Sequence, residues 1–309
     1  MINNQEGFMT NSKFEIVPMD VPSDKIKDYI YNFNEITCGT GSMILFDGDA
    51  RMGRMYAEFN GKWIHTDASD PEHLFKIANH AEIGVFSTQL GMMARYGLDY
   101  RNVKYLVSLN SKTKYNLAAD QDFFNQALVD IEQVIDFKQN SGLNIVGVGY
   151  TVYFGSKNEP DLLREAAQIV QKAHEHGLIV VLKLKAAGLQ LAQQNQESFI
   201  YDIAGVAACL GGDFAIVDLP KTKKDLKRII TKIIKAAGRT KIVCKDDSQI
   251  EKEKFLDSIY LQAQSGVNGI AVGPNFYQKG LLDAIKLSNA VAAIILKNKS
   301  VKESLGLLK

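Results

Sequence analysis

Two lysines and an aspartate stand at the ends of two short apolar runs, where they could perform acid–base or covalent chemistry. Lys183 and Lys185 lie toward the end of the stretch at residues 177–188, and Asp218 lies toward the end of the stretch at residues 211–221. Runs that are apolar along most of their length and polar only at the end are typical of parallel strands buried on both faces. The carboxyl ends of such strands are where ligands bind in parallel sheets and barrels.

Side-chain alternation predicts which way these groups point. Successive side chains lie on opposite faces of a strand, so Lys183 and Lys185 share one side, as do Ile216 and Asp218. A lysine packed beneath outer helices would be an unpaired buried charge, which is costly. We therefore expect both lysines and Asp218 to point inward and to meet at the mouth of a barrel.

Strand-like and helix-like segments alternate along most of the chain, which indicates the fold. Such units repeated over about 250 residues are typical of an α/β protein of the (β/α)8 (TIM) barrel type. The alternative is a doubly wound open sheet, but no Gly-x-Gly-x-x-Gly turn follows the first strand. The strands are expected at residues 42–46, 83–87, 105–109 and 144–150, within the stretches 177–188 and 211–221, and at residues 241–244 and 269–272.

The barrel is expected to occupy residues 37–309, after an N-terminal extension at residues 1–36. Within that extension, residues 25–34 have the pattern of a short amphipathic helix that could cap the bottom of the barrel. We also expect a helix over residues 122–139 and a frayed basic tail at the end of the chain.

Composition narrows the class of protein. The 309 residues are 46% hydrophobic and 23% charged, with a net charge of +1, which is ordinary for a soluble globular chain and favours neither nucleic acid nor membrane as a partner. Three widely spaced cysteines suit neither a metal site nor a disulfide framework. No apolar run could span a membrane and no signal-peptide pattern is present, so we expect a cytoplasmic protein.

Five longer motifs resemble one protein family. On these residues the chain resembles the archaeal-type class I fructose-bisphosphate aldolases, from about residue 37 to residue 295. The resemblance implies a barrel that uses no metal or organic cofactor and forms a homo-oligomer. It also implies an imine between a strand-six lysine and the substrate ketone, with a first-strand aspartate and a strand-five tyrosine moving protons. The motifs are Thr88–Gly97, Leu109–Thr113, Gly147–Ser156, Ala208–Phe214 and Ala271–Gln278.

The family's catalytic positions are only partly kept in this sequence. By the resemblance, Asp49 falls on the family aspartate. Ile216 stands where the family has its imine lysine, and Lys185 stands where it has its tyrosine. Ser108 stands at a further lysine position on strand three.

The two turns that hold phosphate in the family also differ. Asp246 and Asp247 stand at the Gly-Gly turn after strand seven, where two carboxylates would repel a phosphate. Gly273 and Pro274 stand at the Gly-Arg turn after strand eight, and the proline removes both a bidentate side chain and a backbone amide. A bisphosphate held in the family's own geometry is therefore disfavoured.

We expect the imine lysine to have moved from strand six to strand five. Lys185 is the first choice and Lys183 the second, because neighbouring cations lower each other's pKa and so release an amine near neutral pH. Asp49 or Asp218 would serve as the acid and base. The substrate is expected to contact Lys112, Tyr150, Lys245, Ser248, Gly273 and Asn275.

Two functions stay open on the sequence. One is a class I aldolase-like lyase that makes or breaks a carbon–carbon bond in a small sugar or ketone, phosphorylated or not, through a lysine imine. The alternative is a catalytically inactive paralogue that serves as a binding or assembly subunit, with its lysines paired to Asp49, Asp218, Asp246 and Asp247.

Overall fold

Eight parallel strands form the centre of the molecule and close into a barrel in sequence order, with β8 pairing back to β1. The computed structural model describes residues 17–53, 56–113, 125–187, 196–220, 225–245 and 251–308. The (β/α)8 barrel is confirmed, and the open sheet is excluded. The strands are β1 (Met43–Asp47), β2 (Val85–Thr88), β3 (Tyr105–Ser108), β4 (Ile145–Phe154), β5 (Ile179–Ala186), β6 (Phe214–Asp218), β7 (Lys241–Lys245) and β8 (Gly269–Val272).

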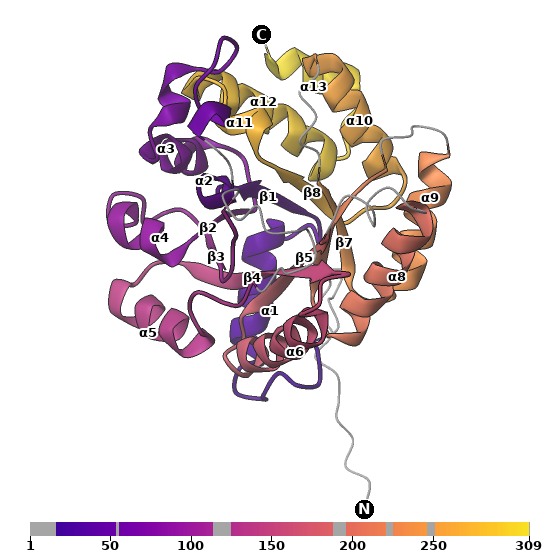
Figure 1. The fold of residues 1–309 in the computed structure, drawn as a ribbon. Coiled ribbons are helices and arrows are strands. Elements are labelled where there is room, and N and C mark those ends of the chain that lie inside the picture. Colours follow the sequence, from indigo (N-terminus) through magenta and orange to yellow (C-terminus); the bar gives the residue numbers. More distant parts are fainter. Residues whose placement is uncertain are drawn as a thin grey trace, which may run out of the picture.

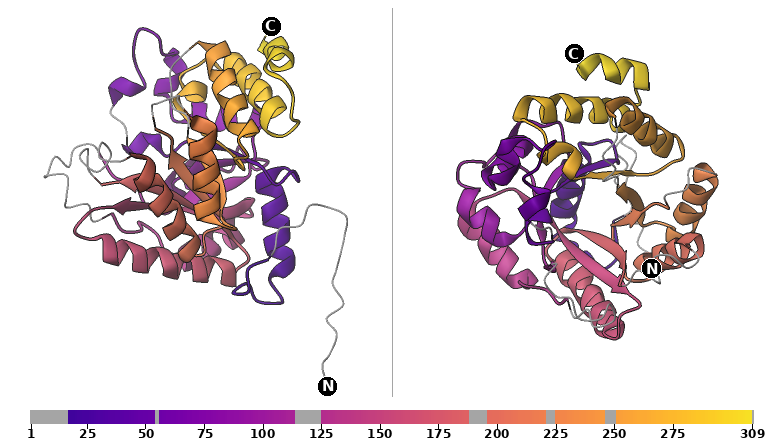
Figure 2. Two further views of the ribbon diagram at one scale, coloured as in Figure 1. Left: turned by 90° about the vertical axis from the view of Figure 1, so that its right-hand side faces the viewer. Right: turned by 45° about the horizontal axis from the view of Figure 1, so that its top comes forward.

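Helices surround the strands as an outer ring (Figures 1 and 2). Each buries an apolar stripe against the barrel; on α9, for example, Leu226, Ile229, Ile230 and Ile233 are buried at helical spacing. The helices of the ring are α3 (Glu72–His80), α4 (Leu90–Tyr96), α5 (Ile131–Ser141), α6 (Glu159–Glu175), α8 (Gln196–Cys209), α9 (Leu226–Ala237), α10 (Lys252–Gln264) and α12 (Leu281–Ile295). Shorter helices follow two strands: α2 (Ala50–Gly53), η1 (Tyr56–Glu58) and η2 (Thr66–Ser69) after β1, and α11 (Pro274–Tyr277) after β8.

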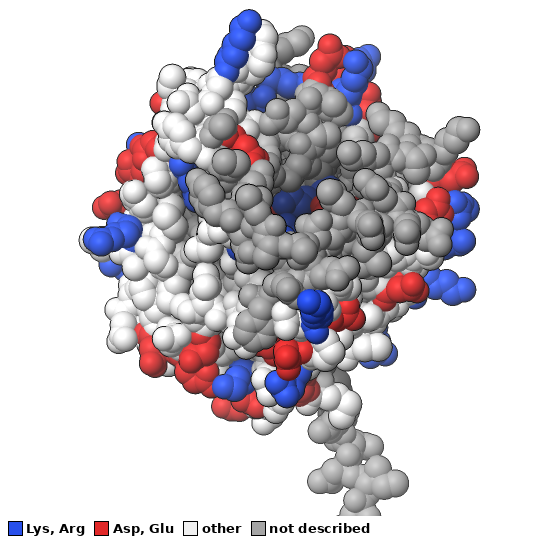
Figure 3. Space-filling model, viewed as in Figure 1, with Lys and Arg blue, Asp and Glu red and all other residues white. Residues whose placement is uncertain are grey.

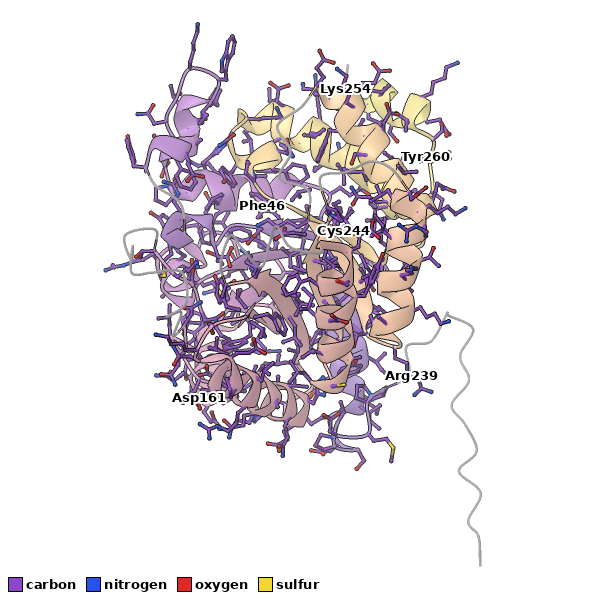
Figure 4. All side chains as sticks on the ribbon, turned by 45° about the vertical axis from the view of Figure 1, so that its right-hand side comes forward. Phe46, Asp161, Arg239, Cys244, Lys254 and Tyr260 are labelled. Atoms are coloured by element: carbon purple, nitrogen blue, oxygen red, sulfur yellow. The ribbon has the colours of Figure 1, made fainter. Side chains whose placement is uncertain are left out.

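The strands separate two apolar cores, because alternate side chains of each strand face opposite ways. The outer core lies between strands and helices and includes Phe46 of β1 and Cys244 of β7, both labelled in Figure 4. The inner core fills the barrel and includes Leu45, Leu106 and Val181. We call the end of the barrel where the strands finish the mouth. In a regular strand, the side chains that reach the mouth are those that follow an inner-core residue at intervals of two.

One helix closes the opposite end of the barrel. In α1 (Ile26–Thr37), Tyr29, Phe33 and Ile36 are buried and pack against the inner core. Asn32 Nδ2 donates a hydrogen bond of 2.8 Å to the Gly177 carbonyl, in the turn before β5. The helix expected at residues 25–34 is therefore present and runs three residues further, while the domain division at residue 36 stays a prediction.

Two local expectations were wrong. The helix α5 begins at Ile131 rather than at residue 122, because Asp130 and Gln133 form a capping box there. The C-terminal tail is folded rather than frayed: Ser300 and Glu303 form a second capping box at the start of α13 (Val301–Leu305), which continues into η3 (Gly306–Leu308). None of the helices in the described ranges is long and apolar enough to cross a bilayer.

Candidate active site at the barrel mouth

The fifth strand carries both candidate lysines into the barrel. Val181 of β5 belongs to the inner core, whereas Leu182 and Leu184 belong to the outer core. Lys183 and Lys185 follow Val181 at intervals of two and therefore continue its inward side. Figure 3, which has the viewpoint of Figure 1, shows lysine or arginine atoms at the centre of this face of the molecule.

Lys183 is locked in place by two carboxylates. Its Nζ lies 3.2 Å from Asp47 Oδ1 and 2.6 Å from Asp49 Oδ2. Longer contacts of 3.4 Å reach the hydroxyls of Ser87 and Ser108, and only 5% of the residue is exposed. Burial lowers the pKa of Lys183, but the two carboxylates outweigh burial and raise that pKa above its ordinary value. Lys183 is therefore a fixed ammonium group and a poor nucleophile.

Room for Lys183 comes from a glycine on the neighbouring strand. A Cβ on Gly149 of β4 would lie 3.1 Å from Leu106 Cδ2 and 3.8 Å from Lys183 Cε. Any larger side chain would enter the space that the lysine stem occupies. The missing side chain of Gly149 thus lets Lys183 cross the barrel toward β1.

Asp47 is the ionised partner of two lysines. It ends β1 on the inward side of Met43 and Leu45, and its Oδ2 lies 3.2 Å from Lys245 Nζ of β7. Burial alone would raise the pKa of Asp47, but Lys183 and Lys245 outweigh burial and hold that pKa well below its usual range.

The pKa of Asp49 is shifted in the opposite direction to that of Asp47. It lies in the turn after β1 and accepts a hydrogen bond of 2.9 Å from Ser108 Oγ, which in turn lies 2.9 Å from Ser87 Oγ. Burial and the neighbouring charge of Asp47 raise the pKa of Asp49, against the opposing charge of Lys183. Of the two carboxyl groups, Asp49 is therefore the one that is more easily protonated.

Lys185 differs from Lys183, although it lies only two residues away on the same face. Within the described residues its amine makes no hydrogen bond and no ion pair. Burial lowers the pKa of Lys185, and Lys245 lowers it further, against the smaller opposing effects of Asp218 and Asp47. A lowered pKa is what a nucleophilic lysine requires, although Lys185 is half-buried rather than fully buried.

The sixth strand, β6, brings fewer polar side chains to the candidate active site than the sequence suggested. Ile216 pairs in register with Lys183 and belongs to the inner core, so an apolar side chain occupies the inward position at this level. Asp218 ends β6 and is exposed. Its charge acts on Lys185, but it is not part of the hydrogen-bonded cluster around Lys183.

Tyr150 lies outside the barrel, contrary to its expected place at the substrate. Its hydroxyl donates a hydrogen bond of 2.5 Å to Glu165 Oε2 of α6, and its ring belongs to the outer core. The cause is an irregularity in the pairing of β3 with β4, where Tyr105 pairs with Ile145 but Leu106 pairs with Gly147. The extra residue reverses the alternation of β4 beyond it.

Tyr153 faces the mouth in place of Tyr150. It pairs in register with Lys185, is 5% exposed, and has a pKa that burial and then Asp49 raise above its ordinary value. Lys112, in the loop after β3, places its Nζ 4.8 Å from the centre of the Tyr153 ring. Lys112 is therefore near the mouth, as expected.

The remaining predicted residues lie near the ends of the last two strands. Lys245 ends β7 and reaches Asp47, as described above. Gly273 follows β8 directly, and Asn275 is buried in α11. Ser248, together with Asp246 and Asp247, lies outside the described residues.

The fold brings four further residues to this site: Asp47, Ser87 and Tyr153, which the sequence analysis did not name, and Ser108, which it named only as the position of a family lysine. For Asp47 the signal was present, because Met43 and Leu45 share its side of β1. Ser87 and Ser108 likewise continue the inward sides of Val85 and Leu106. Tyr153 gave no usable signal, because its direction depends on the irregularity in β4.

The geometry describes a (β/α)8 barrel whose mouth holds a half-buried lysine with a lowered pKa near an aspartate with a raised pKa. Among relatives, a fructose-bisphosphate aldolase/6-deoxy-5-ketofructose 1-phosphate synthase of Methanocaldococcus jannaschii is 43% identical over 290 residues, covering 94% of this chain and 93% of its own. The solved fructose-bisphosphate aldolase from Slackia heliotrinireducens is 40% identical with a TM-score of 0.91, covering 95% of this chain and 93% of that one. An archaeal fructose 1,6-bisphosphate aldolase, 24% identical with a TM-score of 0.73, covers 86% of this chain and 98% of its own and supports the fold alone.

Residues 42–279 match the family described as DeoC/LacD family aldolase. The chain belongs to this family and is a class I aldolase-like protein. The resemblance inferred from the sequence motifs is thereby confirmed.

Proposed function

We propose that the protein is a class I aldolase that makes and breaks a carbon–carbon bond through an imine on Lys185. One observation carries the proposal: of the two inward lysines of β5, Lys183 is held by carboxylates, whereas the amine of Lys185 has no partner among the described residues and a lowered pKa. An imine requires an unprotonated amine, so the two lysines are not equivalent candidates.

The chemistry in the cleavage direction follows from this amine. Lys185 Nζ attacks the ketone carbon, and the resulting carbinolamine loses water to give an iminium ion. A base removes the proton of the β-hydroxyl as the carbon–carbon bond breaks, the bond electrons form an enamine, and an aldehyde leaves. Protonation of the enamine carbon and addition of water release the second product and restore the amine.

Asp49 is the proposed acid and base for the β-hydroxyl and the enamine carbon. Its raised pKa and its fixed position between Lys183 and Ser108 suit it to take and return a proton. Asp218 is the second candidate, at the exposed end of β6. Asp47 is not proposed for this role, because Lys183 and Lys245 hold it ionised.

The proposed substrate is a ketose phosphate or a related small ketone. The names of the relatives include a fructose bisphosphate and a ketofructose phosphate, and Lys112 and Lys245 place positive charge near the mouth. We propose that Lys112, Lys245, Gly273, Asn275 and Ser248 contact the substrate. Tyr150 is left out of this set, because its hydroxyl points at Glu165.

We further propose that the protein acts in the cytoplasm as a homo-oligomer. Both proposals rest on the family resemblance and, for the cytoplasm, on the three widely spaced cysteines at positions 38, 209 and 244. Light scattering of the purified chain tests the association, and a single-chain mass would contradict it.

The decisive experiment is imine trapping. The protein is incubated with dihydroxyacetone phosphate or with pyruvate, reduced with borohydride, weighed intact and then mapped by peptide mass. We expect one adduct on Lys185 that is absent from Lys185→Met, together with a loss of cleavage activity on the order of 10⁴-fold or more in that variant.

The matched control is Lys183→Met, the same substitution two residues earlier on the same face, which should still form the adduct on Lys185. An adduct on Lys183 or Lys245 would contradict the assignment of the lysine. The absence of any adduct with either ketone would favour the catalytically inactive binding subunit.

A further inference from the structure

Lys185 has a phenol beside it on the next strand. Tyr153 and Lys185 are register partners across β4 and β5, so their side chains lie on the same face of the sheet, although the Tyr153 ring also packs against the outer core. Neighbouring strands lie about 4.8 Å apart, so directly paired side chains on one face are adjacent. Tyr153 is thus the closest titratable side chain that β4 can present to a substrate bound at Lys185.

The surroundings of Tyr153 keep its hydroxyl protonated. Burial raises the pKa of Tyr153, and the nearby charge of Asp49 raises it further, while Lys245 acts in the opposite direction. Lys112 covers the ring at 4.8 Å and fixes one side of it. A buried phenol of this kind enters the reaction as a proton donor.

Imine formation requires such a donor. The hydroxyl of the carbinolamine leaves as water only if it receives a proton as the carbon–oxygen bond breaks. Asp49 accepts hydrogen bonds from Lys183 and Ser108 on the same oxygen, Oδ2, and Asp218 is exposed at the end of β6. Tyr153 is the buried group that flanks the amine and already carries a proton.

We infer that Tyr153 is a catalytic residue that donates this proton, an assignment that rests on the proposed imine at Lys185. As the carbon–oxygen bond breaks, the phenol proton passes to the leaving oxygen, water departs, and the nitrogen lone pair forms the carbon–nitrogen double bond. The phenolate that remains takes a proton back from the water molecule that later hydrolyses the product iminium. Atoms and charge balance over the cycle without any further reactant.

The same strand provides a matched control. Tyr150 and Tyr153 are buried tyrosines three residues apart, but the hydroxyl of Tyr150 faces α6 and bonds to Glu165. The experiment follows the rate of adduct formation in borohydride-quenched time courses with dihydroxyacetone phosphate, for the unmodified protein, Tyr153→Phe and Tyr150→Phe. We expect Tyr153→Phe to slow adduct formation on Lys185 about 100-fold and Tyr150→Phe to change it no more than a few-fold.

The outcomes separate this inference from the proposed function. No adduct in the unmodified protein would overturn both, whereas an adduct that forms at the same rate in Tyr153→Phe would overturn only the role of Tyr153. Should Tyr153→Phe fail to fold, site-specific replacement by difluorotyrosine keeps the ring and hydroxyl but makes the phenol more acidic. The rate of adduct formation must then differ from that of the unmodified protein when difluorotyrosine stands at position 153 and must stay the same when it stands at position 150. An unchanged rate with difluorotyrosine at position 153 would overturn the inference.

Discussion

Each end of the barrel holds a network of charged side chains around a buried cation, His174 or Lys183, but the two networks differ in how completely they are paired. At the closed end, His174 of α6 has no exposed surface, and its ring nitrogens lie 2.9 Å from Asp20 Oδ2 and 3.1 Å from Asp213 Oδ2. Asp213 also accepts hydrogen bonds from the Tyr29 hydroxyl, at 2.5 Å, and from the Val180 amide, at 2.7 Å. Each charged group there has a partner.

In the network at the mouth, the inner charged groups are paired, but Lys185, nearer the opening, is not paired with any described residue. Lys183 and Lys245 are matched by Asp47 and Asp49, but Lys185 has no such partner among the described residues. Desolvating an amine costs free energy, and no ion pair or hydrogen bond with a described residue offsets that cost at Lys185. Among the described residues, charged groups are therefore paired more completely at the closed end than at the mouth, and this difference supports the reactive role proposed for Lys185.

The largest expected effect on stability distinguishes the two lysines of β5. Lys183→Met removes the ammonium that two buried carboxylates share, and we expect the free energy of unfolding near neutral pH to fall by about 3–5 kcal/mol. Lys185→Met removes a desolvated amine that pairs with no described residue, so the free energy of unfolding should stay unchanged or rise. Urea unfolding of both variants measures the difference.

One result would contradict the predicted difference in stability between the two lysine variants. Equal losses of stability in Lys183→Met and Lys185→Met would mean that both amines are paired in solution. The reactive role of Lys185 would then lose its physical basis, even if the barrel itself were unaltered.

The next effect belongs to the closed end and depends on pH. Burial would lower the pKa of His174, but the hydrogen bonds and charges of Asp213 and Asp20 outweigh burial and raise that pKa to about 9. The folded value lies above the ordinary value of about 6.5, so the stabilisation is complete below about pH 6.5 and is lost as the pH rises through about 9. We expect about 3 kcal/mol of the free energy of unfolding to disappear across this window.

A His174→Gln variant isolates that contribution. Its free energy of unfolding should lie well below that of the unmodified protein at about pH 6, and the gap should close by about pH 9.5. A gap that stays constant across the range would show that the imidazolium is not held by Asp20 and Asp213.

How much of this could be predicted from the sequence depends on the range of the interactions involved. Alternation within one strand is local, so the inward direction of Lys183 and Lys185 followed from β5 alone, and the same rule applied to β1 would have found Asp47. The direction of Tyr150 could not be predicted, because one extra residue in the pairing of β4 with β3 reverses it. Which lysine is paired depends on carboxylates more than 130 positions away along the chain, which only closure of the barrel brings near.

The smallest expected effect on stability comes from replacing a tyrosine by phenylalanine, a substitution that can be made at both ends of the barrel. Tyr29→Phe removes a hydrogen bond to a buried carboxylate, so the free energy of unfolding should fall by about 2 kcal/mol, while adduct formation at Lys185 should keep its rate. Tyr153→Phe should instead slow adduct formation at Lys185 about 100-fold, because its hydroxyl is assigned to the reaction. Denaturation and trapping of both variants test this directly. A Tyr29→Phe protein that unfolds normally but traps slowly would mean that the closed end acts on the mouth, so the two networks could no longer be treated as separate.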